Sequence, residues 1–294
     1  MRHDSAMAQT DIATPGPSAQ SRDIASMLNL FKRAPQAPAP SPLPPAGSAF
    51  FKFEDDILQE KAAHYSAGYN GAHPFPHVVI DNFLPLDVAE RIHAAYPGVD
   101  DPVWFDWKAG DTVNQPKKLG VRHASRMEGA PPLIHNMCYA FNSYTFLHFL
   151  ETLTGLKDLI SDPCLNGGGM HQILPGGKLR VHADFNMIEP FGLYRKLNAI
   201  LYLNKDWDES WGGDLQLWNR DATKCEARVM PHFNRLAVFS TLSTSHHGHP
   251  EPLACPEGRT RKSLAFFYYS RHPEEGDVTP RTVQWKKLEE STPV

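Results

Sequence analysis

The chain has 294 residues, of which 41% are hydrophobic and 21% charged, and its formal net charge is −4. This composition is ordinary for a globular protein with a sizeable core, and the negative charge argues against a general nucleic-acid-binding surface, which needs a basic field. No apolar run approaches the ~20 residues of a membrane span, and no secretory signal is visible. We therefore expect a cytoplasmic protein whose partners are neither nucleic acids nor membranes. The sequence indicates no particular oligomeric state.

Cysteine usage agrees with this compartment. The four cysteines form no Cys-x-x-Cys pair and are scattered along the chain, at Cys138, Cys164, Cys225 and Cys255. Such spacing favours free thiols in a reducing compartment over a disulfide framework. Four buried cysteines that act as small apolar residues explain the pattern equally well.

Residues 1–48 are predicted to form a disordered tail. The segment 34–45 is rich in proline, which favours an extended polyproline II conformation without a core. Ile24–Lys32 has the pattern of a short amphipathic helix, and a transient helix is favoured over one that docks on a partner. The folded part is expected to begin near Ala49.

Residues 49–160 are predicted to form a mainly helical support region. Helices are expected at 51–67, 87–95 and 133–153, with a strand and turn at 75–84. Between them, residues 100–132 are irregular and polar, and a long loop at such a place is often a substrate lid. A surface excursion with aromatic anchors fits equally well. The aromatic and basic residues of this loop are Trp104, Trp107, Lys117, Lys118, Arg122 and Arg126.

Residues 161–272 have a different pattern, of short β runs separated by glycine and proline. Many short strands with turn signals predict a sandwich or barrel. The runs are 169–174, 179–185, 196–203, 214–218, 235–240, 246–250 and 262–269. Residues 273–294 are expected to be a polar C-terminal tail with one last surface strand around 283–288.

The chemistry is concentrated in a His-x-Asp pair within this β-rich region. Side chains alternate along a strand, so His182 and Asp184 should share a face, about 7 Å apart along the strand. A second histidine cluster follows at His246, His247 and His249. Two histidines and one carboxylate are the ligands of the facial triad, which leaves coordination positions of a non-haem iron open for oxygen chemistry.

These residues also carry a family resemblance. The order His-x-Asp, Gly-Gly-Asp-Leu, His-Gly and Arg-x-Ser-Leu resembles the Fe(II)/2-oxoglutarate-dependent dioxygenases, in particular their prolyl-4-hydroxylase-like branch. The resemblance covers about residues 74–271 and is densest from Gly167 onward. It implies an α+β protein whose mainly β core is a double-stranded β-helix, the jelly-roll-like fold of cupins, with flanking N-terminal helices.

The resemblance implies a set of iron ligands. His182 and Asp184 would be the first two, and the histidine directly before a glycine, His247, the third. Strand alternation puts His247 and His249 on one face and His246 on the other, so His249 is the alternative third ligand.

Other residues are candidates for binding the co-substrate and the substrate. Arg261 matches the basic residue that holds the distal carboxylate of 2-oxoglutarate in the family, and a guanidinium suits that task as a planar, always charged donor. Ser263 shares its face, whereas Lys262 should point away. The further candidates are Asn198 and Tyr202 for the co-substrate, and Asn186, Trp218 and Arg220 for the substrate. One of His171 and Gln172 should also face inward.

The activity implied is hydroxylation of an unactivated C–H bond, with 2-oxoglutarate and dioxygen converted to succinate and carbon dioxide. Fe(II) is the implied cofactor and ascorbate an expected reductant. The branch resembled suggests a peptidyl or amino-acid substrate, with proline one option. Two other classes stay open: a cupin-like metalloenzyme that does not use 2-oxoglutarate, and a non-catalytic scaffold whose working part is the proline-rich tail.

Overall fold

Two antiparallel β-sheets form the framework of the computed structural model. The structure describes residues 50–106, 113–121, 127–162, 164–165, 167–273 and 278–286. The expected tail of residues 1–48 lies outside these ranges, as do Trp107, Arg122 and Arg126 of the expected lid.

The larger sheet has nine strands among the described residues. Its order is β1-β11-β8-β13-β5-β3-β2, with β4 paired to β13 and β7 paired to β8. The strands are β1 (His77–Ile80), β2 (Phe105–Asp106), β3 (Lys118–Gly120), β4 (Ile160–Ser161), β5 (Gly169–Ile173), β7 (Met187–Ile188), β8 (Leu193–Tyr202), β11 (Arg235–Ser240) and β13 (Arg261–Ser270).

The smaller sheet has five strands in the described part of the chain, in the order β10-β9-β12-β6-β14. They are β6 (Leu179–Ala183), β9 (Leu215–Trp218), β10 (Cys225–Val229), β12 (His247–His249) and β14 (Gln284–Trp285). Strands distant in sequence are neighbours in both sheets, and the core is mainly antiparallel β. This architecture confirms the predicted α+β class with a double-stranded β-helix core.

The central strands β8 and β13 are almost entirely buried because both of their faces are covered. On β8, Leu197 and Leu201 belong to the hydrophobic core on one face, whereas Asn198 and Tyr202 line a cavity on the other. The alternation of the pleat thus separates residues that stabilise the fold from residues available for chemistry.

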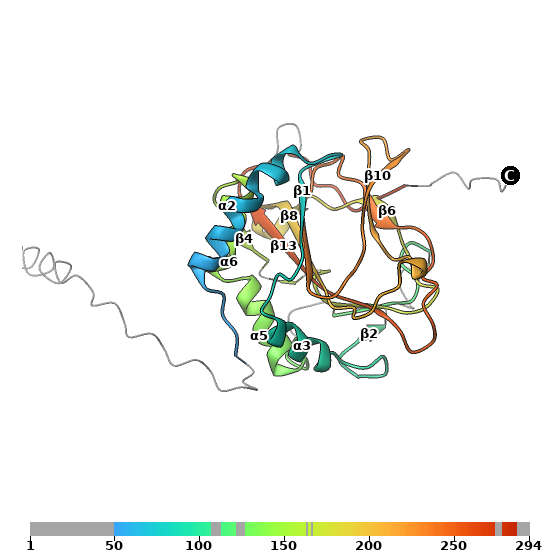
Figure 1. Cartoon of the computed structure of the whole chain (residues 1–294). Coiled ribbons are helices and arrows are strands. Elements are labelled where there is room, and N and C mark those ends of the chain that lie inside the picture. Colours follow the sequence, from blue (N-terminus) through green and yellow to red (C-terminus); the bar gives the residue numbers. More distant parts are fainter. Residues whose placement is uncertain are drawn as a thin grey trace, which may run out of the picture. The chain divides into compact units, whose positions relative to one another are not determined.

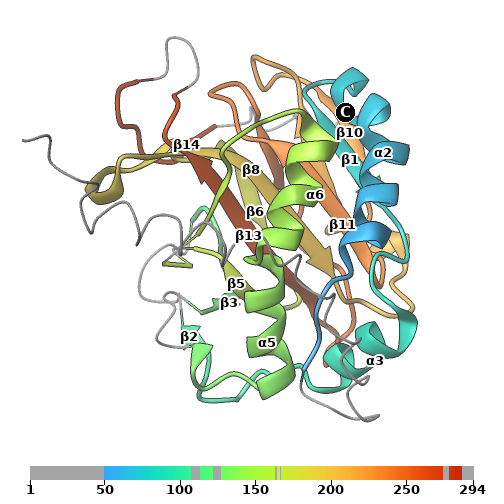
Figure 2. The same ribbon diagram turned by 90° about the vertical axis from the view of Figure 1, so that its left-hand side faces the viewer.

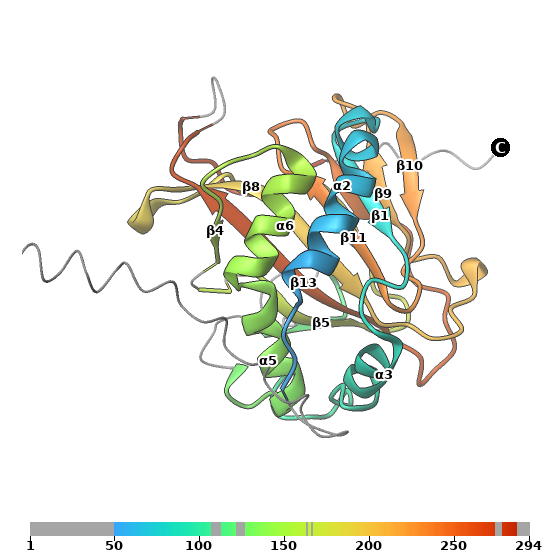
Figure 3. The same cartoon turned by 60° about the vertical axis from the view of Figure 1, so that its left-hand side comes forward.

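Four helices accompany the larger sheet: α2 (Asp55–Gly71), α3 (Leu86–Ala94), α5 (Pro132–Phe141) and α6 (Tyr144–Thr154). In Figure 1 they lie on the side of the larger sheet that faces away from β6 and β10. Figures 2 and 3 show α2 and α6 side by side across the outer face of β8, β11 and β13. The expected flanking helices are therefore present, and they leave the other face of the sheet for the site.

The prediction of one helix over residues 133–153 is wrong, because two helices occupy this range. Asn142 leaves helical geometry, and Ser143 has an extended backbone with φ −73° and ψ 158°. The Ser143 hydroxyl accepts a hydrogen bond from the Phe146 N–H at 3.3 Å. Serine is a preferred N-cap residue, so α5 ends before Asn142 and α6 begins after Ser143, although the apolar periodicity continues through both helices.

Aromatic rings join these helices to the larger sheet. Phe141 of α5 stacks on Phe266 of β13 with ring centroids 4.3 Å apart, and it also contacts Phe53, Phe83 and Phe146. Phe141, Phe146 and Phe266 are fully buried. This cluster packs the helical layer against the strand that begins with Arg261.

Five short strands were not expected from the sequence, and two of them matter for the site. β2 and β3 lie within the loop 100–132 and extend the larger sheet through β5. The expected last strand is present as β14, but it pairs with β6 beside His182 rather than standing on the surface. Among the described helices, none combines the length and the apolar character needed to cross a membrane.

Truncating Phe141 should destabilise the fold strongly. Phe141→Ala leaves a cavity beneath β13, and we expect the free energy of unfolding to fall by about 3–5 kcal/mol. Tyr139→Ala on the same helix is the matched control, because Tyr139 is 66% exposed, and it should cost less than about 0.5 kcal/mol. Urea unfolding of both variants checks this. Similar losses for the two would contradict the packing described here.

Candidate metal centre

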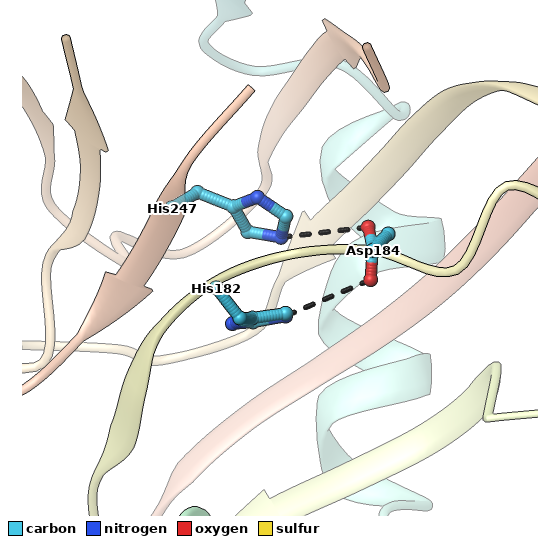
Figure 4. A group of neighbouring side chains, drawn as sticks. All are labelled: His182, Asp184 and His247. Carbon is cyan, nitrogen blue, oxygen red and sulfur yellow. Dashed lines mark ion pairs between the residues drawn. The ribbon is translucent and has the colours of Figure 1, made fainter. Parts of the chain in front are cut away.

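Three buried side chains converge on one point between the two sheets. His182, Asp184 and His247 each offer a ligand atom, and these atoms all lie within 4.8 Å of one another. Figure 4 shows both imidazoles turned toward the carboxylate. The Nε2 atoms of His182 and His247 lie 3.6 Å from Oδ1 and Oδ2 of Asp184, respectively. At 3.6 Å these contacts are too long for hydrogen bonds, whereas they suit atoms that share one ion about 2.1 Å from each.

Strand pairing brings the two histidines together. His182 on β6 is the direct partner of His247 on β12, and their ring centroids are 4.4 Å apart. Gly248 makes this pairing possible, because a Cβ there would lie 2.8 Å from the Leu179 carbonyl and 2.9 Å from that of Arg180. Asp184 lies one residue beyond the end of β6. In the His247-Gly248 dipeptide, the histidine therefore faces the metal centre, and the glycine lets β12 approach the backbone of β6 closely.

The second nitrogen of each imidazole meets a backbone carbonyl. Nδ1 of His182 lies 2.9 Å from the Arg180 oxygen, and Nδ1 of His247 lies 3.0 Å from the Ser245 oxygen. A carbonyl only accepts, so Nδ1 carries the proton and Nε2 presents its lone pair to the centre. This arrangement is usual for histidines that bind a metal. Burial and the neighbouring His182 also lower the pKa of His247 to about 4, which keeps that imidazole neutral.

Asp184 is held as a carboxylate by the groups around it. Burial alone would raise its pKa, but the charge of Arg195 and the two histidines outweigh burial and hold the pKa well below its ordinary value. Arg195 Nη2 lies 3.1 Å from Oδ2, and Asn198 donates to the same oxygen at 2.8 Å. Arg195 also donates to the Asn198 side chain and lies 3.6 Å above the Phe267 ring. The carboxylate is thus fixed in orientation as well as in charge.

A cavity of about 310 Å³ opens beside these three residues. Both sheets contribute to its walls, and its volume is near the lower end of the range for small-molecule sites. Its apolar wall includes Ile200, Leu215, Phe267 and Trp285, and its polar wall includes Lys118, His171, Tyr202, His249, Arg261 and Ser263. The cavity therefore suits a small, strongly anionic ligand with an apolar portion.

Arg261 is fixed at the cavity wall by three contacts. Its Nε donates to the Gly213 carbonyl at 2.6 Å, its Nη2 donates to the Tyr202 hydroxyl at 3.3 Å, and its guanidinium lies 4.9 Å from the Tyr202 ring centroid. Gly213 has a φ of +76°, and a Cβ there would lie 2.5 Å from Leu253 Cδ2 and 3.1 Å from Arg261 Cδ. The second glycine of the Gly-Gly-Asp-Leu motif thus makes room for the arginine.

Two cavity cations were not identified as site residues from the sequence. Lys118 of β3 is partly buried and lines the cavity, and burial lowers its pKa to about 8. Regular strand alternation does not predict Arg195 as a site residue, because it places Arg195 on the face of β8 opposite to Asn198 and the cavity. The register of β8 against β13 shifts between Tyr268 and Tyr269, and this bulge returns Arg195 to the cavity side. The sequence signal available for Arg195 is a charged residue within a largely buried strand, and Lys196 beside it gives the same signal.

The expected site residues divide into two groups. Asn198, Tyr202, Arg261 and Ser263 line the cavity with the three convergent residues. The substrate candidates Asn186, Trp218 and Arg220 are not among its lining residues. Asn186 instead bonds to the Thr279 carbonyl and the Arg281 N–H, and Trp218 donates to Gln216.

The remaining histidines and the last strand are also clearly placed. His171 faces the cavity, whereas Gln172 accepts a hydrogen bond from Thr260. His246 does not line the cavity, and His249 does, although His249 does not belong to the convergent group. Trp285 of β14 contacts His182 with ring centroids 4.7 Å apart, which brings the C-terminal region to the site.

Two of the solved structures that this chain resembles are prolyl hydroxylases. A prolyl hydroxylase from Trichoplax adhaerens, in complex with a peptide fragment of the hypoxia-inducible-factor oxygen degradation domain, is 15% identical, with a TM-score of 0.52 over 76% of this chain and 95% of that one. A prolyl-4-hydroxylase from Pseudomonas putida is 22% identical, with a TM-score of 0.39 over 71% and 99% of the two chains. At such identities the first likeness shows a shared fold.

Sequence comparison adds the family. No curated protein sequence matches the chain. A family model described as the 2OG-Fe(II) oxygenase superfamily matches residues 168–269, which span β5 to β13 and include all three convergent residues.

Removing the Asn198 amide should weaken metal binding. Asn198→Ala deletes the donor to Asp184 Oδ2, and loss of such outer hydrogen bonds typically lowers metal affinity about 10- to 100-fold. Titration calorimetry with Mn²⁺ under anaerobic conditions measures the effect. Asn219→Ala, in a partly exposed turn outside the cavity, is the control and should bind Mn²⁺ like the unaltered protein. Equal affinities for all three proteins would contradict the role given to Asn198.

Proposed function

Because residues 168–269 make the chain a member of the 2OG-Fe(II) oxygenase superfamily, we propose that His182, Asp184 and His247 are its iron ligands. Two neutral imidazole nitrogens and one ionised carboxylate are the donors of a facial triad, and they leave the remaining positions open. The bound Fe(II) supplies the oxygen chemistry, in which 2-oxoglutarate and dioxygen become succinate and carbon dioxide while a substrate C–H becomes C–OH.

The observation that carries this function is the buried, fixed guanidinium of Arg261 in the same cavity as the triad. A guanidinium taken out of water needs an anionic partner, and a planar carboxylate fits it with two parallel hydrogen bonds. We assign Arg261 to the distal carboxylate of 2-oxoglutarate. The Tyr202 hydroxyl, which accepts from Arg261, and Ser263, its neighbour on the cavity face, complete the polar end.

Asn198 and Arg195 serve the metal rather than the co-substrate in this proposal. Their contacts keep Asp184 ionised and oriented toward the two imidazoles. Phe267 and Trp285 line the same cavity and keep bulk water away from the reacting groups. The protein thus binds, orients and shields, and the reactivity itself comes from iron, dioxygen and 2-oxoglutarate.

The proposed substrate is a peptidyl or amino-acid side chain, with proline as the leading candidate. The Trichoplax adhaerens enzyme of similar fold is a prolyl hydroxylase in complex with a peptide. Ascorbate is the reductant we expect to sustain turnover.

A reducing, cytoplasmic compartment suits this chemistry. All four cysteines are free, which supports such a compartment. It would also keep the iron ferrous between turnovers.

Arg261→Met should raise the KM for 2-oxoglutarate about 100-fold, because the distal carboxylate would lose its charged, bidentate partner. Succinate release with Fe(II), ascorbate and dioxygen measures it. Lys262→Met is the matched control, because Lys262 lies outside the cavity lining, and its KM should change less than about twofold. An unchanged KM in Arg261→Met would favour a metalloenzyme that does not use 2-oxoglutarate.

Peptides that contain proline should stimulate succinate release. Free amino acids, prolyl peptides and matched alanyl peptides are compared at equal concentration, with mass spectrometry of each product. We expect a prolyl peptide to gain about 16 Da, the mass of one oxygen atom, in step with the succinate formed. Stimulation by free amino acids alone would redirect the substrate to the free acid, and stimulation by neither class would contradict the proposed substrate.

A further inference from the structure

His249 is a buried histidine without a hydrogen-bond partner among the described residues. The residue is 2% exposed, and neither Nδ1 nor Nε2 has a hydrogen-bond partner in the described part of the chain. A buried polar group left without a partner costs about 1–3 kcal/mol, so such groups in native proteins call for an explanation. The two neighbouring metal-site histidines, by contrast, both use Nδ1 on a backbone carbonyl.

The position of His249 puts this imidazole at the cavity wall. His249 is opposite Leu179 across β12 and β6, with a shift of register between His247 and His249. It lines the same cavity as the two cations Arg261 and Lys118. An unpartnered imidazole beside two cations is placed to meet an anionic ligand.

Across the cavity from His249, three adjacent strands of the larger sheet carry a row of residues that are paired directly with one another. Arg261, Ile173 and Lys118 are direct partners across β13, β5 and β3, so their side chains leave the same face of the sheet. Arg261 and Lys118 therefore flank Ile173, and His249 comes from the smaller sheet on the other side of the cavity. A carboxylate accepts about four hydrogen bonds, so a single guanidinium does not exhaust it.

We propose that His249 is a co-substrate-binding residue that donates a ring N–H to the distal carboxylate of 2-oxoglutarate, beside Arg261. This inference rests on the proposed function and adds to it a determinant of co-substrate specificity. Both the neutral and the charged imidazole carry an N–H, so either form can donate. The side chain would then select five-carbon 2-oxo acids that end in a carboxylate over those that end in a methyl group.

The test compares two ligands of equal chain length. 2-Oxoglutarate has the distal carboxylate, and 2-oxopentanoate has a methyl group there. Binding of each to the full chain loaded with Mn²⁺ is measured by calorimetry without dioxygen. In His249→Leu we expect the Kd for 2-oxoglutarate to rise about 10- to 100-fold, and the Kd for 2-oxopentanoate to stay within about twofold.

Stability without co-substrate separates a binding role from a structural one. Leucine replaces an unpartnered polar group with an apolar one of similar size, so His249→Leu should unfold at the same temperature or a higher one when no 2-oxo acid is present. His249→Gln keeps an N–H and should recover part of the affinity for 2-oxoglutarate. His246→Gln, on the neighbouring residue outside the cavity lining, should bind both ligands like the unaltered protein.

The outcomes separate the inference from the function on which it rests. If the unaltered protein binds Mn²⁺ but not 2-oxoglutarate, the proposed function fails. If it binds 2-oxoglutarate and His249→Leu binds it equally well, the proposal for His249 is overturned. Equal weakening of both ligands would overturn it as well, since His249 would then act at the metal end. Loss of Mn²⁺ binding in His249→Leu would make His249 a metal ligand and would also overturn it.

Discussion

The candidate metal centre depends on keeping the buried carboxylate of Asp184 ionised, so that it can bind one metal ion together with the two neutral imidazoles. Burial raises the pKa of Asp184, but the charge of Arg195 and the two histidines outweigh burial and keep the carboxyl ionised, while the Asn198 amide fixes its orientation. Arg195 in turn is covered by the Phe267 ring rather than by water. The Phe267 ring thus packs on Arg195, and Arg195 in turn contacts the carboxylate of Asp184. A buried polar network of this kind is stable only if all of its members have partners.

The two-sheet framework explains how these groups meet with little conformational freedom. His182 and His247 are partners in one sheet, whereas Asn198 and Arg195 come from the other. The helices cover the outer face of the larger sheet, and the inner face is left for polar chemistry. The stacked pair of Phe141 and Phe266 links these layers. The helical layer therefore supports the strand that carries Arg261 from the outer face of the larger sheet.

Much of this arrangement could be predicted from the sequence, because strand alternation is a strong rule where the pleat is regular. It directs Lys262 away from Arg261, and Lys262 indeed lies outside the cavity that Arg261 lines. It also predicts that His182 and Asp184 face one point, and they converge although Asp184 lies one residue beyond the end of β6. The rule fails where a bulge shifts the register, and so it missed Arg195. The alternation rule also does not predict that Trp285 lies beside His182. The pairing of a two-residue strand such as β14 with the distant β6 depends on tertiary contacts rather than on the local sequence pattern. Lys118 was hidden for the same reason, within a segment whose composition resembles a loop.

The most direct test of the central claim is the visible spectrum of the protein titrated with Fe(II) and 2-oxoglutarate without oxygen. If the three residues hold iron and the co-substrate chelates it, a weak charge-transfer band should appear in the full chain and vanish in His182→Ala. Its appearance would establish metal and co-substrate in one site before any substrate is known. A folded, iron-loaded protein that shows no band on addition of 2-oxoglutarate would contradict the account.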